Sequence, residues 1–446
     1  MIRRATVKLL LTTLVMVILL AACGSNDNGN SGSNSATDSA EQAKKVTLRF
    51  FSNLPDRKTG QGLAEQTIID NFMKENPNVK IEVEALGGEA QGNKLRTYMA
   101  SNEPIDITMV TGGANLDTLR QAGYVKELNP ADYSGDEFGF LPGSFQNFTF
   151  DGKLYALPRN SDFEIIYYNK KLFEDNGIQV PTTIDELIAS AKEFRAKGII
   201  PMSMFGKDLW NLGEMYQNIV ARVSGDQQAI LDAVEGKLSF KDDPAFLEGA
   251  KIFKQLVDAG LFQDGFMTAD YGMSQNLFTQ GRAAMWYSGS WEAGMATNND
   301  LSEEFRANLN VASFPVVEGG KGKATDLQAW NGGGLALVAA SKHPEEAKKF
   351  FDYMMSAQQW PKYGWELGGL FPAQKFELTG DEPEVQRKMN DMLGNATSTP
   401  GSSWIDHGTA AFKDDTNNLF GAFASGSITP EQLIDKLQEV SEKQRK

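Results

Sequence analysis

Short apolar runs alternate with amphipathic segments through the first third of the chain. Residues 46–51, 79–83 and 105–110 are typical of strands, because each is a short apolar run between polar or turn-forming residues. Between the first two runs, apolar residues recur at helical spacing until Asn76-Pro77, which predicts a helix with a proline after its end. Strands that alternate with helices favour a parallel sheet in an α/β domain.

The rest of the chain repeats this alternation and then becomes mainly helical. A capping box at Thr183 and Glu186 predicts a helix start between two strand-like runs, 163–169 and 199–205. Later strands are expected at 283–287, 307–315 and 333–339, and later helices at 344–356, 384–393, 409–425 and 430–443. A chain of 446 residues is too long for one core, so the pattern predicts an α/β fold with two lobes of roughly 200 residues each and a helical C-terminal part.

The first 45 residues have the pattern of an export signal. Arg3, Arg4 and Lys8 precede an apolar stretch at 9–22, which is too short for a membrane span and typical of a signal peptide. Leu20-Ala21-Ala22-Cys23 resembles the lipobox of bacterial lipoproteins, which implies cleavage after residue 22 and lipid attachment at Cys23. The Gly-, Ser- and Asn-rich residues 24–45 are expected to form a flexible tether. The alternative is an ordinary secretory signal with a chance cysteine.

Composition removes several classes of function. Lys and Arg number 43 against 58 Asp and Glu, a formal net charge of −15, so nucleic acid is not expected as a partner. With two histidines and one cysteine, a zinc or transition-metal site is not expected either. The chain has no Walker A loop and no Rossmann glycine fingerprint, and its folded region has no Gly-x-Ser-x-Gly elbow. We therefore expect no cofactor, no metal and no catalytic residue.

Five segments carry recognisable patterns in a fixed order along the chain. They are YYNKKLF at 167–173, PTTIDELIASAKEFRAKGIIPMSMFG at 181–206, FTQGRAAMWYSGSW at 278–291, WNGGGLALVAASKHPEEAKKFFDYMMS at 330–356 and GGLFPA at 368–373. Together they resemble the bacterial extracellular solute-binding proteins of family 1, the maltodextrin-binding type that supplies ABC importers. One departure is Ile184, which stands where that family usually has tryptophan.

The resemblance implies a periplasmic-binding-protein-like fold of type II, with crossover strands as a hinge and the ligand in the cleft between the lobes. It places lobe one at 46–158 plus 288–340 and lobe two at 159–287 plus 341–446. It also implies a monomeric receptor that binds a sugar or oligosaccharide and delivers it to an ABC permease. Its expected location is the outer face of the cell membrane, with a Gram-positive host favoured by the lipobox and the tether.

A sugar site needs aromatic platforms for the C–H-rich face of the ring and polar side chains for its hydroxyls. Trp291 and Trp330 are the strongest candidates, because each lies in a turn- or glycine-rich segment at a strand end. Core packing is the alternative for every tryptophan, and it is favoured for Trp286 and Trp360. The further candidates are aromatic, polar or glycine residues in similar positions: Trp210, Asn211, Glu292, Asn331, Gly332, Trp365, Trp404 and Asp406.

Polar and glycine residues also follow the first and third predicted strands, where α/β sheets place their ligands. Asn53, Asp56 and Arg57 follow the first strand, with a solvated loop as the alternative, and Gly112 and Gly113 follow the third. The third strand lacks the aromatic and charged cluster of the maltodextrin binders, which argues against maltodextrin as the ligand. Asp162, after the first crossover, is expected to accept a sugar hydroxyl.

Two alternative functions remain open from the sequence. An extracellular glycoside-active enzyme would use two carboxylates about 5 or 6.5–9.5 Å apart, and Asp and Glu are plentiful. The same receptor fold with another ligand is the second alternative. A polyamine would need more acidic residues in the cleft, whereas Arg57 and Arg159 could serve a phosphate ester.

Overall fold

The computed structural model describes residues 45–445. The signal peptide, the lipid-attachment residue Cys23 and nearly all of the tether predicted above lie outside this range. Within it, no helix combines the length and the apolar character that crossing a membrane requires.

The first lobe is built around a mixed sheet with strand order β2-β1-β3-β12-β6. Strand β1 pairs in parallel with β2 and β3, whereas β12 runs antiparallel to both β3 and β6. Its strands are β1 (Val46–Ser52), β2 (Val79–Ala85), β3 (Ile107–Thr111), β6 (Leu157–Pro158) and β12 (Gly333–Leu337). Its helices are α1 (Gly60–Glu75), α2 (Gly88–Ser101), α3 (Ala114–Gln121), α11 (Pro344–Met355) and α12 (Trp360–Glu366), with short elements η1 (Pro130–Tyr133), η2 (Gln146–Phe148), β4 (Thr149–Phe150) and β5 (Lys153–Leu154).

The second lobe is built around a sheet with strand order β10-β7-β9-β8, and β11 also pairs with β7. Its strands are β7 (Asp162–Asn169), β8 (Ile200–Ser203), β9 (Ala283–Gly289), β10 (Leu309–Ala312) and β11 (Ala329–Trp330). Its N-terminal helices are α4 (Lys170–Asn176), α5 (Ile184–Ala196), α6 (Trp210–Ser224), α7 (Ala229–Glu235), α8 (Pro244–Asp258), η3 (Phe266–Thr268) and α9 (Tyr271–Thr279). The later helices are η4 (Ser290–Ala296), α10 (Glu303–Asn308), α13 (Glu384–Gly394), α14 (Trp404–His407), α15 (Ala410–Ala424) and α16 (Pro430–Gln444).

The central strands of the second sheet are buried on both faces. Successive side chains of a strand point to opposite faces. Ile165 and Ile166 of β7 accordingly belong to two different apolar clusters. Trp286 and Tyr287 of β9 divide in the same way. This double coverage explains why these strands are continuous apolar runs in the sequence instead of alternating patterns.

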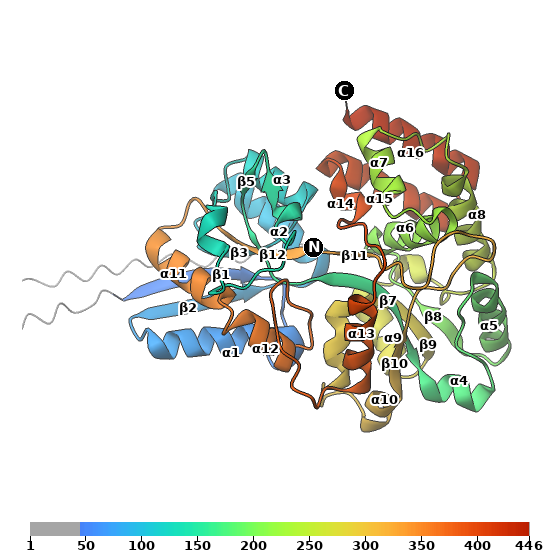
Figure 1. The fold of residues 1–446 in the computed structure, drawn as a ribbon, viewed down its shortest axis with the longest axis horizontal. Helices are drawn as coiled ribbons and strands as arrows, with labels where there is room; N and C mark the ends of the chain where they lie inside the picture. Colours follow the sequence, from blue (N-terminus) through green and yellow to red (C-terminus); the bar gives the residue numbers. More distant parts are fainter. Residues whose placement is uncertain (1–44, 446) are drawn as a thin grey trace, which may run out of the picture. The chain divides into compact units, whose positions relative to one another are not determined.

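The chain passes between the lobes at three places. Strand β6 of the first sheet is followed directly by β7 of the second, and β11 of the second sheet by β12 of the first. A third passage joins α12 to α13 (Figure 1), and there Ser161 N–H donates to the Phe371 carbonyl at 2.7 Å. The two-lobed α/β architecture with crossover strands therefore agrees with the predicted fold class.

The lobe boundaries differ from the prediction in two places. Residues 288–340 were expected in lobe one, but η4, α10, β10 and β11 belong to the second lobe, where β10 and β11 both pair antiparallel with β7. Residues 344–366 were expected in lobe two, but α11 and α12 lie beside α1 on the first lobe (Figure 1), where Phe350 packs against Phe50 and Phe72. Sequence order does not determine which sheet a segment joins, because both segments are amphipathic enough to cover either core.

Candidate functional site

Residues from both lobes meet around a small cavity at the end of β3. The first lobe contributes Thr111, Gly112, Gly113 and Asn147, and the facing side consists of Trp330, Asn331, Gly332, Ser402, Ser403 and Asp406. The cavity measures about 10 Å³, which is room for a single water molecule. The two sides are joined by Asn147, whose Nδ2 donates to the carbonyls of Asn331 at 3.0 Å and Gly401 at 3.1 Å.

Three of the predicted tryptophans form one half-buried row beside this cavity. The ring centroids of Trp210 and Trp291 are 6.0 Å apart, and those of Trp291 and Trp330 are 6.3 Å apart in an edge-to-face arrangement. The three rings come from the start of α6, from η4 and from β11. Each is partly exposed, so the row offers indole surface to a ligand, and Trp210 at one end packs against Phe205.

The middle tryptophan is held in place by a residue that the sequence analysis missed. Trp291 Nε1 donates to the Tyr271 hydroxyl at 2.8 Å, and that hydroxyl donates to a carboxylate oxygen of Glu292. Gln275 Nε2 donates to the other oxygen at 2.7 Å. Burial raises the pKa of Glu292, against these two hydrogen bonds. Glu292, a predicted ligand contact, thus holds the hydroxyl that positions Trp291. Tyr271 follows the N-cap residue Asp270 at the start of α9, a position that predicts a helix start and not a ligand site.

Asp162 lies where the chain leaves the first lobe, beside the glycine loop that follows Trp330. Burial raises the pKa of Asp162 to about 6, while the backbone amides of Gly332 and Gly333 and the charge of Arg159 act in the opposite direction. A Cβ on Gly332 would lie 2.6 Å from Trp330 Nε1 and 3.1 Å from Asp162 Oδ2. Only glycine fits between these two groups, so the predicted acceptor and the predicted aromatic platform are adjacent.

Gly113 lets the two lobes approach each other at backbone distance, and Gly112 allows a close approach between two segments of the first lobe. Gly113 has a φ of +65°, and a Cβ there would overlap the carbonyl oxygen of Asp406. A Cβ on Gly112 would lie 2.9 Å from the carbonyl oxygen of Asn147, a weaker overlap. Asp406 also accepts from Lys413 at 2.6 Å. Gly112, Gly113 and Asp406 therefore line the cavity. The close packing of Gly113 against Asp406 leaves no room for a side chain larger than that of glycine.

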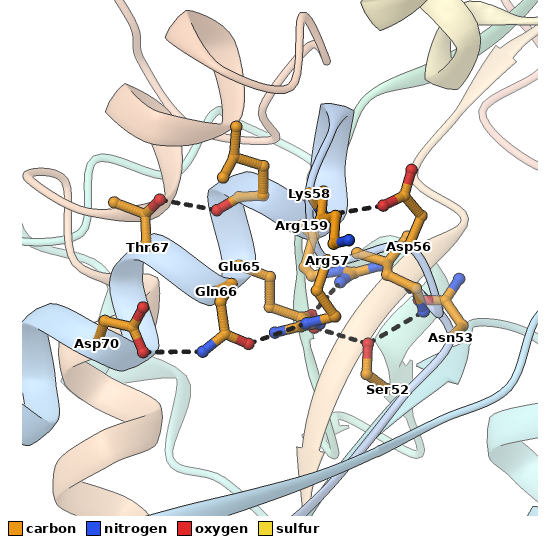
Figure 2. A network of polar contacts seen from close by, with 12 residues as sticks. Ser52, Asn53, Asp56, Arg57, Lys58, Glu65, Gln66, Thr67, Asp70 and Arg159 are labelled. Carbon is orange, nitrogen blue, oxygen red and sulfur yellow. Dashed lines mark hydrogen bonds and ion pairs between the residues drawn. The ribbon is translucent and has the colours of Figure 1, made fainter. Parts of the chain in front are cut away.

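Asn53, Asp56 and Arg57 belong to a polar network at the end of β1 (Figure 2). At its centre is Glu65 of α1, which has no exposed surface and accepts from Ser52 Oγ at 2.6 Å, from Arg57 Nη1 and from Arg159 Nη1 at 3.1 Å. Arg159 Nη2 donates to Asn53 Oδ1 at 3.1 Å. The guanidinium of Arg159 also stands 5.0 Å over the Trp360 ring. Both arginines are thus engaged within the first lobe.

Asp56 has a separate local role in the same loop. Its carboxylate accepts from the Lys58 backbone N–H at 2.8 Å and from the Thr59 hydroxyl. The hydrogen bond from Thr59 lowers the pKa of Asp56 despite some burial. Asp56 therefore stabilises the turn that leads into α1. Glu65, which accepts hydrogen bonds at the centre of the network, could not be predicted from the sequence because it is one acidic residue within an amphipathic helix.

Three predicted ligand contacts are core residues, which corrects the prediction for them. Trp404 is fully buried, donates from Nε1 to the Gly213 carbonyl at 2.9 Å and packs against Tyr216. Trp365, near the end of α12, packs against Phe371 and Phe376. Asn211 is fully buried and donates to the Tyr287 carbonyl at 3.3 Å. Trp404 and Trp365 were considered because of nearby loops and Asn211 because it opens a helix, but packing from elsewhere in the chain covers all three. Trp286 and Trp360 are fully buried as well.

The described residues contain no group of three or more His, Cys, Asp or Glu side chains arranged to hold a metal ion.

Comparisons with known proteins place the chain among binding proteins. Residues 53–359 match the family described as bacterial extracellular solute-binding protein. The chain is 28% identical over 358 residues to the multiple sugar-binding protein of Streptococcus mutans, covering 78% of this chain and 77% of that protein.

Solved structures show the same fold. One, described in work on xylan utilization by the thermophilic bacterium Caldanaerobius polysaccharolyticus, has 30% identity and a TM-score of 0.80, covering 88% of this chain and 99% of its own. A chitin oligosaccharide binding protein has 24% identity and a TM-score of 0.79, covering 90% and 99%. The latter likeness shows the fold alone.

Proposed function

Because the chain belongs to the family of bacterial extracellular solute-binding proteins, we propose that it captures a sugar or short oligosaccharide between its lobes and delivers it to an ABC importer. The observation that carries this proposal is the row formed by Trp210, Trp291 and Trp330. Indole faces pack well against the C–H-rich face of a sugar ring, and adjacent indoles can contact successive faces of a sugar or short oligosaccharide. Sugar binding by similar proteins supports the same conclusion.

Ligand entry requires the lobes to separate. The cavity between them measures about 10 Å³, so a sugar ring does not fit while the lobes keep these contacts. Gln61 of α1 also donates to the Trp291 carbonyl of the other lobe at 3.0 Å. The structure thus corresponds to a closed arrangement, and we propose that ligand and permease act on an equilibrium between this form and an open one.

The neighbouring polar groups favour a neutral sugar over a phosphate ester. A phosphate site needs basic groups whose donors are available to the ligand. Arg159 is 1% exposed and pairs with Glu65, and Arg57 pairs with the same carboxylate. A polyamine would need available carboxylates, whereas Glu292 and Asp406 already have partners.

We propose that the protein performs no chemistry on its ligand. A glycoside hydrolase needs a carboxyl group on each side of the scissile bond, one of them free to transfer a proton. Among the acidic residues beside the tryptophan row, Glu292 is held by Tyr271 and Gln275, and Asp162 by the glycine loop. Release of reducing sugar from an oligosaccharide panel by the purified protein would contradict this part of the proposal.

The proposed location is the outer face of the cell membrane, with Cys23 as the lipid-attachment residue. Radiolabelled palmitate should enter the wild-type protein, and Cys23→Ser should remove the label and move the protein from the membrane fraction to the medium. Retention of Cys23→Ser in the membrane fraction would instead indicate anchoring by other means.

Thermal unfolding against a panel of mono- and oligosaccharides, polyamines and phosphate esters tests the ligand class. A ligand that binds only the folded state at 100 times its Kd stabilises the protein by about 2.7 kcal/mol. A saturable shift with one sugar class is expected. No shift with any sugar, or a shift with a phosphate ester alone, would contradict the proposal.

Removing a platform tests the site itself. Trp330→Ala and Trp291→Ala should each weaken sugar binding by about tenfold to hundredfold, because each ring supplies much of the contact surface. Tyr155→Ala is the matched control, a half-buried aromatic residue that packs on Phe150, away from the row. Isothermal titration calorimetry measures the change, and equal losses in all three variants would point to unfolding instead of a lost contact.

A further inference from the structure

Two carboxyl groups lie buried in the second lobe, and neither lines the cavity or belongs to the tryptophan row. Glu164 on β7 and Glu214 on α6 are each 1% exposed. They are near enough for the charge of Glu214 to act on Glu164. Burying one unpaired carboxylate is costly, and burying two that repel each other is more so.

The hydrogen-bond partners of both groups, within the described chain, are neutral side chains. Glu164 accepts from the Tyr287 hydroxyl, which in turn accepts from Asn218 Nδ2 at 2.8 Å. Glu214 accepts from Ser403 Oγ with one oxygen and from Gln328 Nε2 with the other. Hydrogen bonds from neutral donors offset only part of the cost of burying a negative charge.

The cluster has more acceptors than donors. Glu164 Oε1 and Gln328 Oε1 are both buried and have no hydrogen-bond partner in the structure. Buried oxygens without a donor are rare in folded proteins, and each one requires an explanation. A proton shared by the pair removes one of the two like charges, and when it resides on Glu164 Oε1 it turns that orphaned acceptor into a donor.

Glu214 connects elements that form the cleft. Ser403, its first donor, lines the cavity between the lobes. Gln328, its second donor, lies two residues before Trp330, and the backbone N–H of Glu164 donates to the Gln328 carbonyl at 3.0 Å. Trp210 lies one helical turn before Glu214 on α6. Glu214 thus hydrogen-bonds one residue that lines the cavity and one that lies two positions before Trp330, and it shares a helix with Trp210.

We propose that Glu214 is a positioning residue for the cleft, and that the Glu164–Glu214 pair holds a proton in the folded protein. The positioning role rests on the proposed ligand-binding function, whereas the retained proton does not depend on it.

The electrostatic surroundings agree with this geometry. Burial raises the pKa of Glu214 to about 8; Asp406 of α14 acts in the same direction, while Lys413 of α15 opposes it. Burial and the charge of Glu214 raise the pKa of Glu164, against the hydrogen bonds of Tyr287 and Asn218. A carboxyl whose folded-state pKa is raised stabilises the fold fully below its unfolded-state pKa. That contribution is lost as the pH rises through the folded-state value, here toward about 8.

Infrared spectroscopy of the wild-type protein tests the proton directly. Titration from about pH 5 to pH 9 should show a protonated-carboxyl C=O band that persists near neutral pH, where exposed carboxyl groups are ionised. Glu164→Gln and Glu214→Gln should each reduce this band, and Glu439→Gln, an exposed residue on α16, should leave it unchanged. A wild-type spectrum without the band at neutral pH would overturn the proposal, whether or not the variants fold.

Tryptophan fluorescence of the protein without added ligand tests the positioning role. Glu214→Gln resembles the protonated acid, because its amide can donate to Ser403 and its oxygen can accept from Gln328, so its emission should match the wild type at pH 6. Glu214→Ala should shift the Trp330 component, defined as the difference from the same protein carrying Trp330→Phe, to longer wavelength. At pH 9 the wild type should shift in the same direction, and Glu214→Gln should not.

An identical Trp330 component in all forms at both pH values would overturn the positioning role. If no sugar binds the protein, the proposed function fails. The infrared result would still test the retained proton, and the fluorescence result would still test whether Glu214 positions Trp330.

Discussion

Buried carboxyl groups lie on both sides of the cleft, and they are compensated in different ways. In the first lobe, Glu65 faces two guanidinium groups, Arg57 and Arg159. In the second lobe, Glu164 and Glu214 have hydrogen bonds from neutral side chains instead. A buried carboxylate stays ionised when a cation is paired directly with it, whereas one whose hydrogen-bond donors are all neutral is more stable with a proton. Equal burial therefore produces a fixed ion pair in one lobe and a titratable site in the other.

The largest expected difference between the two lobes is in the free energy of unfolding when a buried Glu is replaced by Gln in each. Glu65→Gln should lower the free energy of unfolding by about 3–5 kcal/mol, because it leaves the buried Arg159 charge unpaired. Glu214→Gln at pH 6 should change it by less than about 1 kcal/mol, because the neutral amide replaces a neutral acid of the same shape. Urea unfolding monitored by circular dichroism gives both values. Similar losses in the two variants would show that Glu214 is ionised at this pH.

The second expected difference is in how the free energy of unfolding depends on pH at the Glu164–Glu214 pair and at Glu65. Each additional proton bound by the folded state lowers the free energy of unfolding by about 1.4 kcal/mol per pH unit as the pH rises. Between the ordinary carboxyl range and about pH 8, the wild type should therefore lose stability at this site. The double variant Glu164→Gln/Glu214→Gln should lose less. Urea unfolding at closely spaced pH values measures the two slopes, and parallel slopes would mean that the pair binds no additional proton on folding.

A smaller effect distinguishes the two arginines within the first lobe. The Arg57 side chain is 19% exposed, and removing it leaves Glu65 paired with Arg159. Arg57→Ala should therefore cost only about 1 kcal/mol, as expected for a partly exposed pair. Arg159→Ala should cost several times more, because Arg159 is fully enclosed and also stands over Trp360. Equal costs in urea unfolding would indicate that solvent screens both pairs alike.

Some of the site could be predicted from local sequence, and the reason is visible in the structure. Trp291 and Trp330 lie in turn- and glycine-rich segments, and the close contact between Gly332 and the Trp330 ring shows why a glycine is needed there. Trp404 lies in a similar loop, yet it packs against Tyr216 in the core. A loop context shows that a side chain lacks regular neighbours along the chain, but not which distant helix covers it.

The charged residues of the site were less accessible to sequence reasoning. Asn53, Asp56 and Arg57 follow the first strand as predicted, but their partners are Glu65, Arg159 and Thr59 instead of an exposed cleft. The pairing of Arg159 with Glu65 joins residues 94 positions apart. No local pattern marks either member, because an isolated acidic or basic residue is equally compatible with a solvated surface.

The sequence by itself determined the α/β alternation, the separation into two lobes, the order of the family motifs and the two best tryptophan candidates. These features depend on interactions between residues that are close along the chain: periodicity, capping and turn chemistry. The tertiary structure decided that β10 joins the second sheet, that α11 covers the first, and which buried carboxyl groups have a cation beside them. Such choices depend on contacts between segments far apart in the chain, where many pairings have similar apolar character and only the completed packing selects one.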